Sequence, residues 1–456
     1  MREPAFAKPT ARQALAPPLF PRQDPVPSIN LSNNLIVQVV SFSIFGTMGP
    51  SASGTYRVVA GEGGSRDRTS KMNPTRNIVQ STLGYETWLR GHITVREPDL
   101  EVKHQFMADD IFMFFRATFY RWCERWYAAC PSLANGDQLF AVGDLHIQNF
   151  GSWRDGHARL IWGVNDYDEV AMMSFAADLV RLIMSAELAS EETLASDLTL
   201  SEICELVREG YSAGLKGAPQ PFVLERRHAW LLRLIRAALK EPKLFWRRWL
   251  RERTQPVAED QIAPLLAARL RQAMPKDVPI EFREVKKGVT KGLGSLGHQR
   301  FFAYTEHHGG PVAMEGKGMA PSAVLWATGK SAKEIHTDRL LKGPGRPSTP
   351  HTSTHEGWLI RPVMSDCGRI DLAELRLEET AQEIDFDRER LLFSMGYETA
   401  NLHQLSKSRE ELNERLKGVK VGALKQAALT MLELLLEDFK MWRKYWRERQ
   451  RAAGAP

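Results

Sequence analysis

Cysteine is scarce in this sequence, and the few cysteines are scattered. Four occur in 456 residues, Cys123, Cys130, Cys204 and Cys367, and none forms a C-x-x-C pair. A disulfide framework needs more cysteines at regular spacing. The simplest interpretation is a set of reduced thiols in a cytoplasm.

Long apolar runs are also lacking. The longest run near the N-terminus, residues 35–45, is interrupted by Gln38, Ser41 and Ser43 and is too short to span a bilayer. No basic segment there leads straight into an apolar stretch with a small-residue cleavage site, so we do not expect a secretory signal. These absences predict a soluble, cytoplasmic protein without a membrane partner.

A strong charge excess is missing as well. Lys and Arg number 61 against 55 Asp and Glu, which gives a net charge of +6. This mild excess suits an anionic ligand but lacks the density of a dedicated nucleic-acid binder. Residues 226–253 interleave aromatic and basic side chains, as a nucleic-acid groove does, but basic amphipathic helices with a buried aromatic face have the same pattern. We therefore expect no nucleic-acid partner.

The composition that remains is globular. Hydrophobic residues make up 43% and charged residues 25%, which excludes a fully disordered, collagenous or coiled-coil chain. The length allows two to four domains or one large bilobal unit.

Periodicity and turn residues divide the chain into segments. Residues 1–54 are rich in Pro, Ala, Ser and Asn and predict a disordered leader. From about 85 to 130, apolar and aromatic residues at helical spacing predict an amphipathic helix with a buried aromatic face. Short apolar runs at 138–142 and 158–164 predict strands, and residues 175–273 predict helices.

A change of character near residue 275 predicts a smaller, sheet-rich unit. Glycine-separated β-type runs follow at 284–289, 300–304, 311–314 and 358–363. Beyond residue 371 the pattern is helical again. It ends in residues 425–451, where a predicted buried stripe consists of Leu429, Leu432, Leu436, Phe439 and Trp442.

The most informative segment is V-G-D-L-H-I-Q-N-F-G, residues 142–151, at a strand-to-loop boundary. Asp144 and Asn149 have the D-x-x-x-x-N spacing of a kinase catalytic loop, in which the Asp accepts a hydroxyl proton and the Asn holds Mg²⁺. The alternative is that both residues are turn formers that hydrogen-bond their own backbone. We assign Asp144 and Asn149 as candidate catalytic residues.

A second segment, residues 161–169, supports the catalytic interpretation. Its apolar strand delivers Asp166, Asp168 and Glu169 to one loop. Carboxylates packed together repel one another unless a cation neutralises them, so the cluster suggests a Mg²⁺ site of hard oxygen ligands. We expect Asn149, Asp166 and Asp168 to be the metal ligands.

A third segment contains Gly292, Gly294 and Gly297 as G-x-G-x-x-G. A dinucleotide-binding turn is the alternative, but such a turn must open a helix, and residues 300–304 are strand-like. The flanks favour the phosphate-covering loop of a kinase. We expect Gly292, Gly294, Ser295 and Gly297 to line the triphosphate of ATP.

Downstream, V-A-M-E-G-K at residues 312–317 is close to the V-A-I-K pattern, in which a strand lysine grips the nucleotide phosphates. A lone lysine is most often a solvated surface residue. The position of Lys317 one strand after a glycine loop favours the nucleotide-binding role. Glu334 lies at a plausible distance in sequence to be its ion-pair partner, although an exposed residue is the favoured description.

These segments carry a resemblance to known proteins. Asp144-Leu-His146 with Asn149 resembles the G-D-L-H-x-x-N loop of aminoglycoside-phosphotransferase-like kinases. Asp166 is similar in position to their metal-binding Asp, and Asp178-Leu179 resembles the D-L pair that braces their catalytic loop. More closely, residues 100–440 resemble the bacterial family called domain of unknown function 2252, which is placed with the protein-kinase-like fold.

The order of these parts differs from that of an ordinary kinase. The catalytic loop comes first, the glycine loop follows at residue 292, and Ala400-Asn-Leu-His403, which resembles the A-x-L-H helix before a kinase catalytic loop, comes last. We therefore expect an α+β, protein-kinase-like bilobal fold that is circularly permuted, with a helix-rich large lobe and a smaller sheet-rich lobe. The expected division is a leader at 1–54, a helical lobe at 55–274, a nucleotide-binding lobe at 275–365 and returning helices at 366–456.

The hypothesis for function is a phosphotransferase that uses ATP and Mg²⁺ and transfers the γ-phosphate to the hydroxyl of a small molecule or a protein. The alternative is a nucleotide-binding pseudokinase or regulator without transfer activity. A pure binder has no need of the base Asp144, which favours the enzyme. The acceptor and the oligomeric state leave no signature in the sequence.

Overall fold

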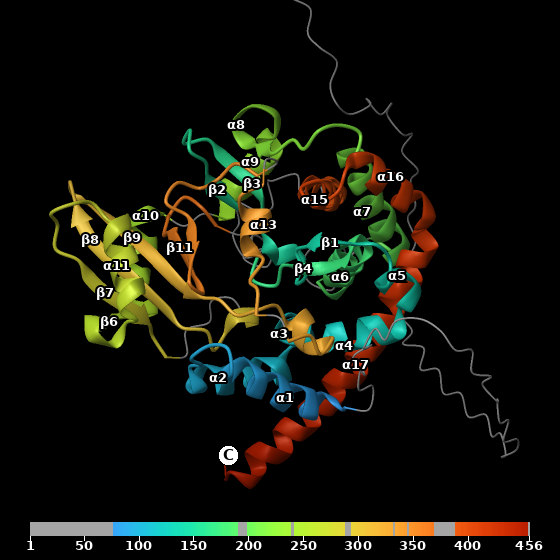
Figure 1. The fold of residues 1–456 in the computed structure, drawn as a ribbon, viewed down its shortest axis with the longest axis horizontal. Coiled ribbons are helices and arrows are strands. Elements are labelled where there is room, and N and C mark those ends of the chain that lie inside the picture. Colours follow the sequence, from blue (N-terminus) through green and yellow to red (C-terminus); the bar gives the residue numbers. More distant parts are fainter. Residues whose placement is uncertain are drawn as a thin grey trace, which may run out of the picture. The chain divides into compact units, whose positions relative to one another are not determined.

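The computed structural model describes residues 76–189, 198–238, 241–287, 293–331, 333–343, 346–368 and 388–454. The predicted leader at 1–54 lies outside these residues. The described segments all lie within one compact unit, and they mix helices with several small sheets (Figure 1).

The N-terminal region is a series of short helices. The sequence predicted one long helix between residues 85 and 130, and this prediction was wrong in its continuity. The chain stops and restarts because Pro98 opens one helix and the Asp110 side chain caps another by accepting from the Met113 backbone N–H at 2.7 Å. The four helices are α1 (Ile78–Arg90), α2 (Glu97–Asp109), α3 (Ile111–Ala117) and α4 (Phe119–Ala129).

The aromatic face predicted for this region is confirmed as core. Phe114, Phe115, Trp122 and Trp126 are each at most 3% exposed. They pack with residues of helix α6 (Phe175–Leu188), which is buried along nearly its whole length. This core lies directly behind the loop that follows residue 141.

Two small antiparallel sheets border that loop. Strand β1 (Gln138–Ala141) pairs with β4 (Ala171–Ser174), and β3 (Leu160–Val164) pairs with β2 (Phe150–Arg154) and with β5 (Phe222–Val223). The strands predicted at 138–142 and 158–164 are confirmed as β1 and β3. The short strands β2, β4 and β5 were not predicted.

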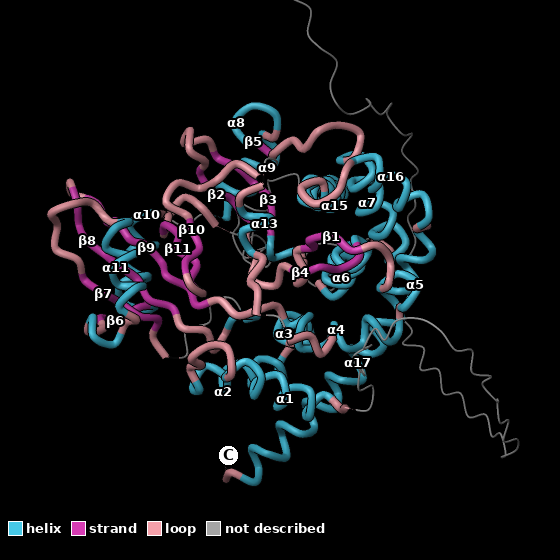
Figure 2. The backbone as a smooth tube through the Cα atoms, in the orientation of Figure 1, coloured by secondary structure: helices cyan, strands magenta, loops and turns pink. Residues whose placement is uncertain are grey.

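The largest of the described sheets has six antiparallel strands (Figure 2). Its order is β10-β11-β9-β8-β7-β6, and all neighbours pair antiparallel. The runs predicted at 300–304, 311–314 and 358–363 are confirmed as strands, and β6 adds a strand inside the stretch predicted to be helical. The run predicted at 284–289 overlaps the observed strand, residues 281–285, only at its first two residues. The strands are β6 (Thr254–Pro256), β7 (Glu281–Val285), β8 (Arg300–His307), β9 (Gly310–Gly318), β10 (Ser353–His355) and β11 (Trp358–Pro362).

The two faces of this sheet are covered differently. Helix α11 (Pro264–Ala273) places Leu266 and Leu270 on one face, against Phe301 and Met314. A π-helical turn, Trp249–Arg253, follows α10 (Pro242–Arg248) and places Trp249 against Phe302 on the other face. Lys317 of β9 lies on the second face as well. Its cross-strand partner is Arg300, and the partner of Glu315 is Phe302, so these four side chains share one face of the sheet.

The C-terminal helices pack onto the helices of the first half of the chain. They are α15 (Arg388–His403), α16 (Arg409–Gly418) and α17 (Val421–Ala452), and α15 packs along α7 (Leu200–Gly214). The α7–α15 approach is close, since a Cβ atom on Gly210 would lie 1.9 Å from the Phe393 carbonyl oxygen. This packing brings the end of α15 to the loop after β1.

The buried stripe predicted for the last helix was only partly correct. Leu429 and Leu436 are 37% and 41% exposed, whereas Phe439 and Trp442 are buried as predicted. Small residues such as Ala427 and Ala428 take part in the buried face, together with larger ones. The buried face of α17 consists of Leu424, Ala427, Ala428, Met431, Leu435, Asp438, Phe439, Trp442 and Trp446.

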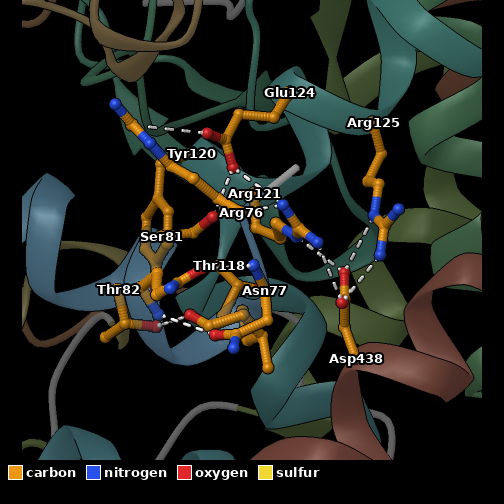
Figure 3. A network of polar contacts seen from close by, with 12 residues as sticks. Arg76, Asn77, Ser81, Thr82, Thr118, Tyr120, Arg121, Glu124, Arg125 and Asp438 are labelled. Carbon is orange, nitrogen blue, oxygen red and sulfur yellow. Dashed lines mark hydrogen bonds and ion pairs between the residues drawn. The ribbon is translucent and has the colours of Figure 1, made fainter. Parts of the chain in front are cut away.

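A buried polar network joins α1, α4 and α17 (Figure 3). The Asp438 carboxylate of α17 accepts from Arg121 at 2.8 and 3.1 Å and from Arg125 at 3.0 and 3.2 Å. Arg121 also donates to Glu124, which accepts from the Ser81 hydroxyl of α1 at 2.6 Å. Residues that are 317 positions apart in sequence are thereby held in one ion-pair cluster.

Among the described residues, none of the helices is at once long and apolar enough to cross a bilayer.

Candidate functional site

The loop after β1 is held from behind by a buried carboxylate. Asp178, at the start of α6, is fully buried and accepts from the backbone N–H groups of Val142 at 2.7 Å and Gly143 at 2.9 Å. Its second support comes from α15, where the His403 Nε2 lies 2.9 Å from the Asp178 carboxylate. The sequence predicted this bracing role for Asp178, and the structure places it there.

A tyrosine completes the support. The Tyr211 hydroxyl lies 2.9 Å from His403 Nδ1. Because the carboxylate can only accept, His403 Nε2 carries a proton and donates to Asp178. Three segments that are far apart in sequence thus fix the position of one loop.

Glycine is required at the turn into this loop. Gly143 has φ +88°, and a Cβ atom there would lie 2.3 Å from the Glu169 carbonyl oxygen. Any larger residue would therefore separate the loop at 143–149 from the loop at 165–169.

Asp144 points one carboxylate oxygen at an arginine and the other at the glycine segment. Its Oδ1 accepts from Arg181 Nε at 2.8 Å and from Arg181 Nη2 at 2.5 Å. Its Oδ2 faces Gly294, where a Cβ atom would lie 3.3 Å away. Burial raises the pKa of the Asp144 carboxyl, and the nearby guanidinium of Arg181 opposes this shift.

Asn149 connects the two loops. Its side-chain amide donates to the Asp144 carbonyl oxygen at 2.5 Å, and its own carbonyl oxygen accepts from the Asn165 backbone N–H at 2.8 Å. Asn149 is 7% exposed and ends a short 3₁₀ turn, Ile147–Asn149. The residues expected to act together, Asp144, Asn149 and Asp166, therefore come from two directly connected loops.

Lys317 meets the acidic loop from the sheet. Its side chain is 1% exposed, forms a close ion pair with Asp168, and has its ammonium nitrogen 3.6 Å from Asp166 Oδ1. Burial and the charge of Asp166 raise the pKa of Asp168 to about 6, and Lys317 opposes this rise. The expected surface glutamate, Glu334, is indeed exposed and lies beside His336. Within the described residues, Lys317 forms its ion pairs with these two aspartates.

The third carboxylate of the loop has another function. Glu169 accepts from the Ser322 hydroxyl at 2.9 Å and from the Ala323 backbone N–H at 2.7 Å. Burial raises its pKa to about 7. Glu169 thus ties the acidic loop to the segment that follows β9.

Only the middle of the glycine segment lies beside the Asp144 loop and the acidic loop. Gly292 lies outside the described residues, whereas Gly294 and Ser295 line a pocket with Asp144. Ser295 accepts from Arg300 Nη2 at 2.6 Å. Gly297 lies apart from the pocket, where its carbonyl oxygen accepts from the Arg96 backbone N–H and a Cβ atom would lie 2.9 Å from Leu100.

Two pockets meet at Asp166. The first pocket is lined by members of three predicted segments: Asp144, Asn149, Asp166, Asp168, Glu169, Gly294 and Ser295. The second lies on the face of the sheet that carries Lys317 and is lined by Phe302, Glu315, Arg361 and, from the opposite side, Trp153. Asp166 lines both pockets, and Lys317 touches Asp166.

Several residues of the site were missed by sequence reasoning. Arg181 lies one turn after Asp178 on α6, and its role depends on a partner 37 positions earlier. Lys103, Arg116 and His298 line the first pocket as well. His298 Nδ1 donates to the Gly318 carbonyl oxygen at 2.9 Å, and burial lowers its pKa to about 3, so its imidazole is neutral at pH 7. None of these residues belongs to a short motif that would have indicated its role.

Few side chains of the site could bind a metal ion. Within the described residues, no group of three or more His, Cys, Asp or Glu side chains is arranged to hold a metal ion. Asp166 and Asp168 are two hard carboxylate donors, and the Asn149 amide is beside them in the pocket. Asp168 Oδ1 is buried and accepts no hydrogen bond from the described residues, so it has an unfilled place for a donor or a cation.

These observations define a mixed α and β protein with a pocket of carboxylates beside a buried lysine. Residues 96–229 match the model of a protein family described as "Uncharacterized protein conserved in bacteria (DUF2252)". The match supports the predicted resemblance to that family, and it contains the Asp144 and Asp166 loops but neither Gly294 nor Lys317. No curated protein and no solved structure matches the chain.

Proposed function

We propose that this protein transfers a phosphoryl group from Mg²⁺-bound ATP to a hydroxyl group, on a kinase-like bilobal fold whose parts occur in permuted order. The observation that carries the proposal is the convergence at Asp166. The lysine of a sheet strand pairs there with the acidic loop, while Gly294 lies against Asp144. In a phosphotransferase, these four elements must lie together around the reacting phosphate.

The proposed nucleotide contacts follow from the two pockets. Lys317 would hold the phosphates, and the backbone at Gly294 and Ser295 would cover them. The base and ribose would occupy the second pocket, where Phe302 and Trp153 supply aromatic surface on the Lys317 side of the sheet.

The donors present fit a magnesium ion. Asp166, Asp168 and Asn149 offer hard oxygen atoms, and the unpaired Oδ1 of Asp168 gives a place for a cation. Bound Mg²⁺ would neutralise negative charge on the phosphates. Binding would also relieve the repulsion between Asp166 and Asp168, which Lys317 and Arg300 partly offset.

Asp144 is the proposed base that orients the acceptor hydroxyl. Its raised pKa makes the carboxylate a better proton acceptor than an exposed aspartate, and Arg181 fixes its orientation. The bracing by Asp178, with His403 from α15, supports the permuted arrangement, because a helix that follows the sheet in sequence lies next to the proposed catalytic loop.

The experiment that tests this proposal is a thermal-shift titration with Mg²⁺ and the non-hydrolysable analogue AMP-PNP. We expect wild type to be stabilised, and we expect Lys317→Met and Asp166→Ala to lose at least about tenfold in affinity. Lys330→Met is the matched control, since Lys330 is exposed and should leave binding unchanged. Absence of stabilisation in wild type, or equal stabilisation of all variants, would contradict the proposal.

One observation favours a second candidate, a nucleotide-binding protein without transfer activity. Arg181 makes two hydrogen bonds to Asp144 Oδ1 and so opposes the rise in the pKa of this carboxyl that burial causes. ATP consumption measured over a panel of hydroxylated metabolites and proteins separates the two candidates. The enzyme predicts consumption that Asp144→Asn abolishes, whereas the regulator predicts nucleotide binding with no consumption.

A further inference from the structure

Lys103 of α2 is a buried cation in the wall of the first pocket. It is 4% exposed and lines the pocket together with Asp144, Asn149 and Gly294. Its ammonium lies 6.0 Å from the centre of the Tyr120 ring, a long cation–π contact. Neither the proposed nucleotide contacts nor the proposed proton transfer uses this lysine.

Lys103 differs from the other buried cations near the site. Arg181 is paired with Asp144, and Lys317 is paired with Asp168. Across the described ranges, the Lys103 ammonium has neither a hydrogen bond nor an ion pair. Burial of an unpaired ammonium is costly, and burial accordingly lowers the pKa of Lys103.

The carboxylates that surround Lys103 already have partners. Glu86 is 2.6 Å from His104 Nε2, Glu169 accepts from Ser322 and Ala323, and Asp144 accepts from Arg181. The protein therefore places an ammonium group in the pocket wall that these carboxylates attract without forming a hydrogen bond to it. A ligand with a negative charge would accept that hydrogen bond.

Other residues that line the pocket indicate the chemistry of the rest of such a ligand. Arg116 is 6% exposed and adds a guanidinium group, which donates to Gln148 at 2.7 Å. The aromatic side chains of Tyr85, Phe119 and Tyr120 form an apolar wall. The Tyr120 hydroxyl is 2.9 Å from the Thr82 hydroxyl, which fixes the ring in place (Figure 3).

We propose that Lys103 binds an anionic group of the acceptor, so that the acceptor is a small hydroxylated molecule that also carries a phosphate or a carboxylate. This inference rests on the proposed function, because the hydroxyl is the group placed at Asp144. The anionic group at Lys103 and the hydroxyl at Asp144 would occupy one pocket, and the nucleotide would approach from the second pocket beyond Asp166.

The test is isothermal titration calorimetry with two simple anions, inorganic phosphate and acetate, on protein saturated with Mg²⁺ and AMP-PNP. We expect one of the two anions to bind wild type and to bind Lys103→Met at least about tenfold more weakly, with AMP-PNP affinity unchanged. The two titrations also distinguish a phosphate-bearing from a carboxylate-bearing acceptor. Lys330→Met is the control for loss of a lysine that does not line the pocket.

Three results would overturn the inference. They are the failure of both anions to bind wild type, equal binding by Lys103→Met, and displacement of the bound anion by AMP-PNP, which would assign Lys103 to the nucleotide phosphates. If AMP-PNP itself does not bind, the proposed function fails, and anion titration of the protein without nucleotide still tests Lys103. Lys103→Gln serves as a second variant if Lys103→Met does not fold.

Discussion

At the scale of the residue, the acidic loop is held partly by carboxyl groups with raised pKa values. Glu169 has a pKa of about 7, compared with 4.5 for an ordinary glutamate, because it is largely buried. The folded protein therefore holds this proton more tightly than the unfolded chain does. The resulting stabilisation is fully present below about pH 4.5 and is lost as the pH rises through about 7.

We predict that Glu169→Gln weakens this pH dependence. The fall in the free energy of unfolding between pH 4.5 and 7.5 should be smaller in the variant by roughly 1 to 3 kcal/mol, since its side chain does not titrate. Urea denaturation at several pH values measures the effect, and Glu414→Gln, at an exposed site, is the control. An unchanged slope in Glu169→Gln would show that this carboxyl titrates normally.

The sequence predicted some residues of the candidate site at this scale and not others. Asp144, Asn149, Asp166 and Lys317 lie in short motifs with fixed spacing, and the structure brings them to one place. Arg181 and Lys103 were missed because each derives its role from tertiary neighbours. A basic residue on a helix predicts a solvated side chain unless its burial is known.

At the scale of the element, the turn at Gly143 decides how closely two loops approach each other. Gly309 is a natural comparison, because it also has positive φ, at +79°, but has open space where its Cβ atom would be. Gly143 has φ +88° and the Glu169 carbonyl oxygen only 2.3 Å from the Cβ position.

We therefore predict different costs for two alanine substitutions. Gly309→Ala should lower the free energy of unfolding by about 1 kcal/mol, the cost of the left-handed conformation. Gly143→Ala should cost at least about 3 kcal/mol, because a steric clash is added. Chemical denaturation of both variants checks this, and equal losses would mean that the two loops do not meet in solution as closely as described.

The elements themselves were predicted with uneven success, for physical reasons. Strands β8, β9 and β11 were found because aromatic and branched residues alternate between glycine turns. The helix expected from 85 to 130 is broken at Pro98 and Asp110, which are local signals that the aromatic periodicity concealed. On α17, alanines in the buried face shifted the stripe away from the one that the large leucines indicated.

At the scale of the whole molecule, the first and last helices are held together by the cluster around Asp438. This carboxylate is 3% exposed in its side chain and contacts the guanidinium groups of Arg121 and Arg125. Removal of one partner from a buried ion pair leaves an uncompensated charge, which costs more than the pair itself contributes.

We predict that Asp438→Ala lowers the free energy of unfolding by about 3 to 5 kcal/mol. Asp366→Ala is the matched control, because Asp366 pairs with Arg154 at the surface, where both side chains are about 40% exposed. The control should lose less than about 1 kcal/mol. Similar losses in the two variants by urea denaturation would show that the cluster stabilises the protein no more than a surface ion pair does.

At this scale, the sequence motifs could suggest only the order of the segments along the chain. Asp178 and His403 are 225 positions apart and meet behind the Asp144 loop. The pairing of Lys317 with Asp168 joins the six-stranded sheet to the acidic loop across 149 positions. Local sequence patterns do not show which side chains these long-range contacts bring together, because that depends on tertiary packing.

The most direct measurement is a crystal structure with Mg²⁺ and AMP-PNP bound. The proposal predicts the triphosphate between Lys317 and the Gly294–Ser295 backbone, Mg²⁺ at about 2.1 Å from a carboxylate oxygen of Asp166, and the adenine ring in the pocket lined by Phe302 and Arg361. A nucleotide bound elsewhere, or a triphosphate without contact to either Asp166 or Lys317, would contradict it.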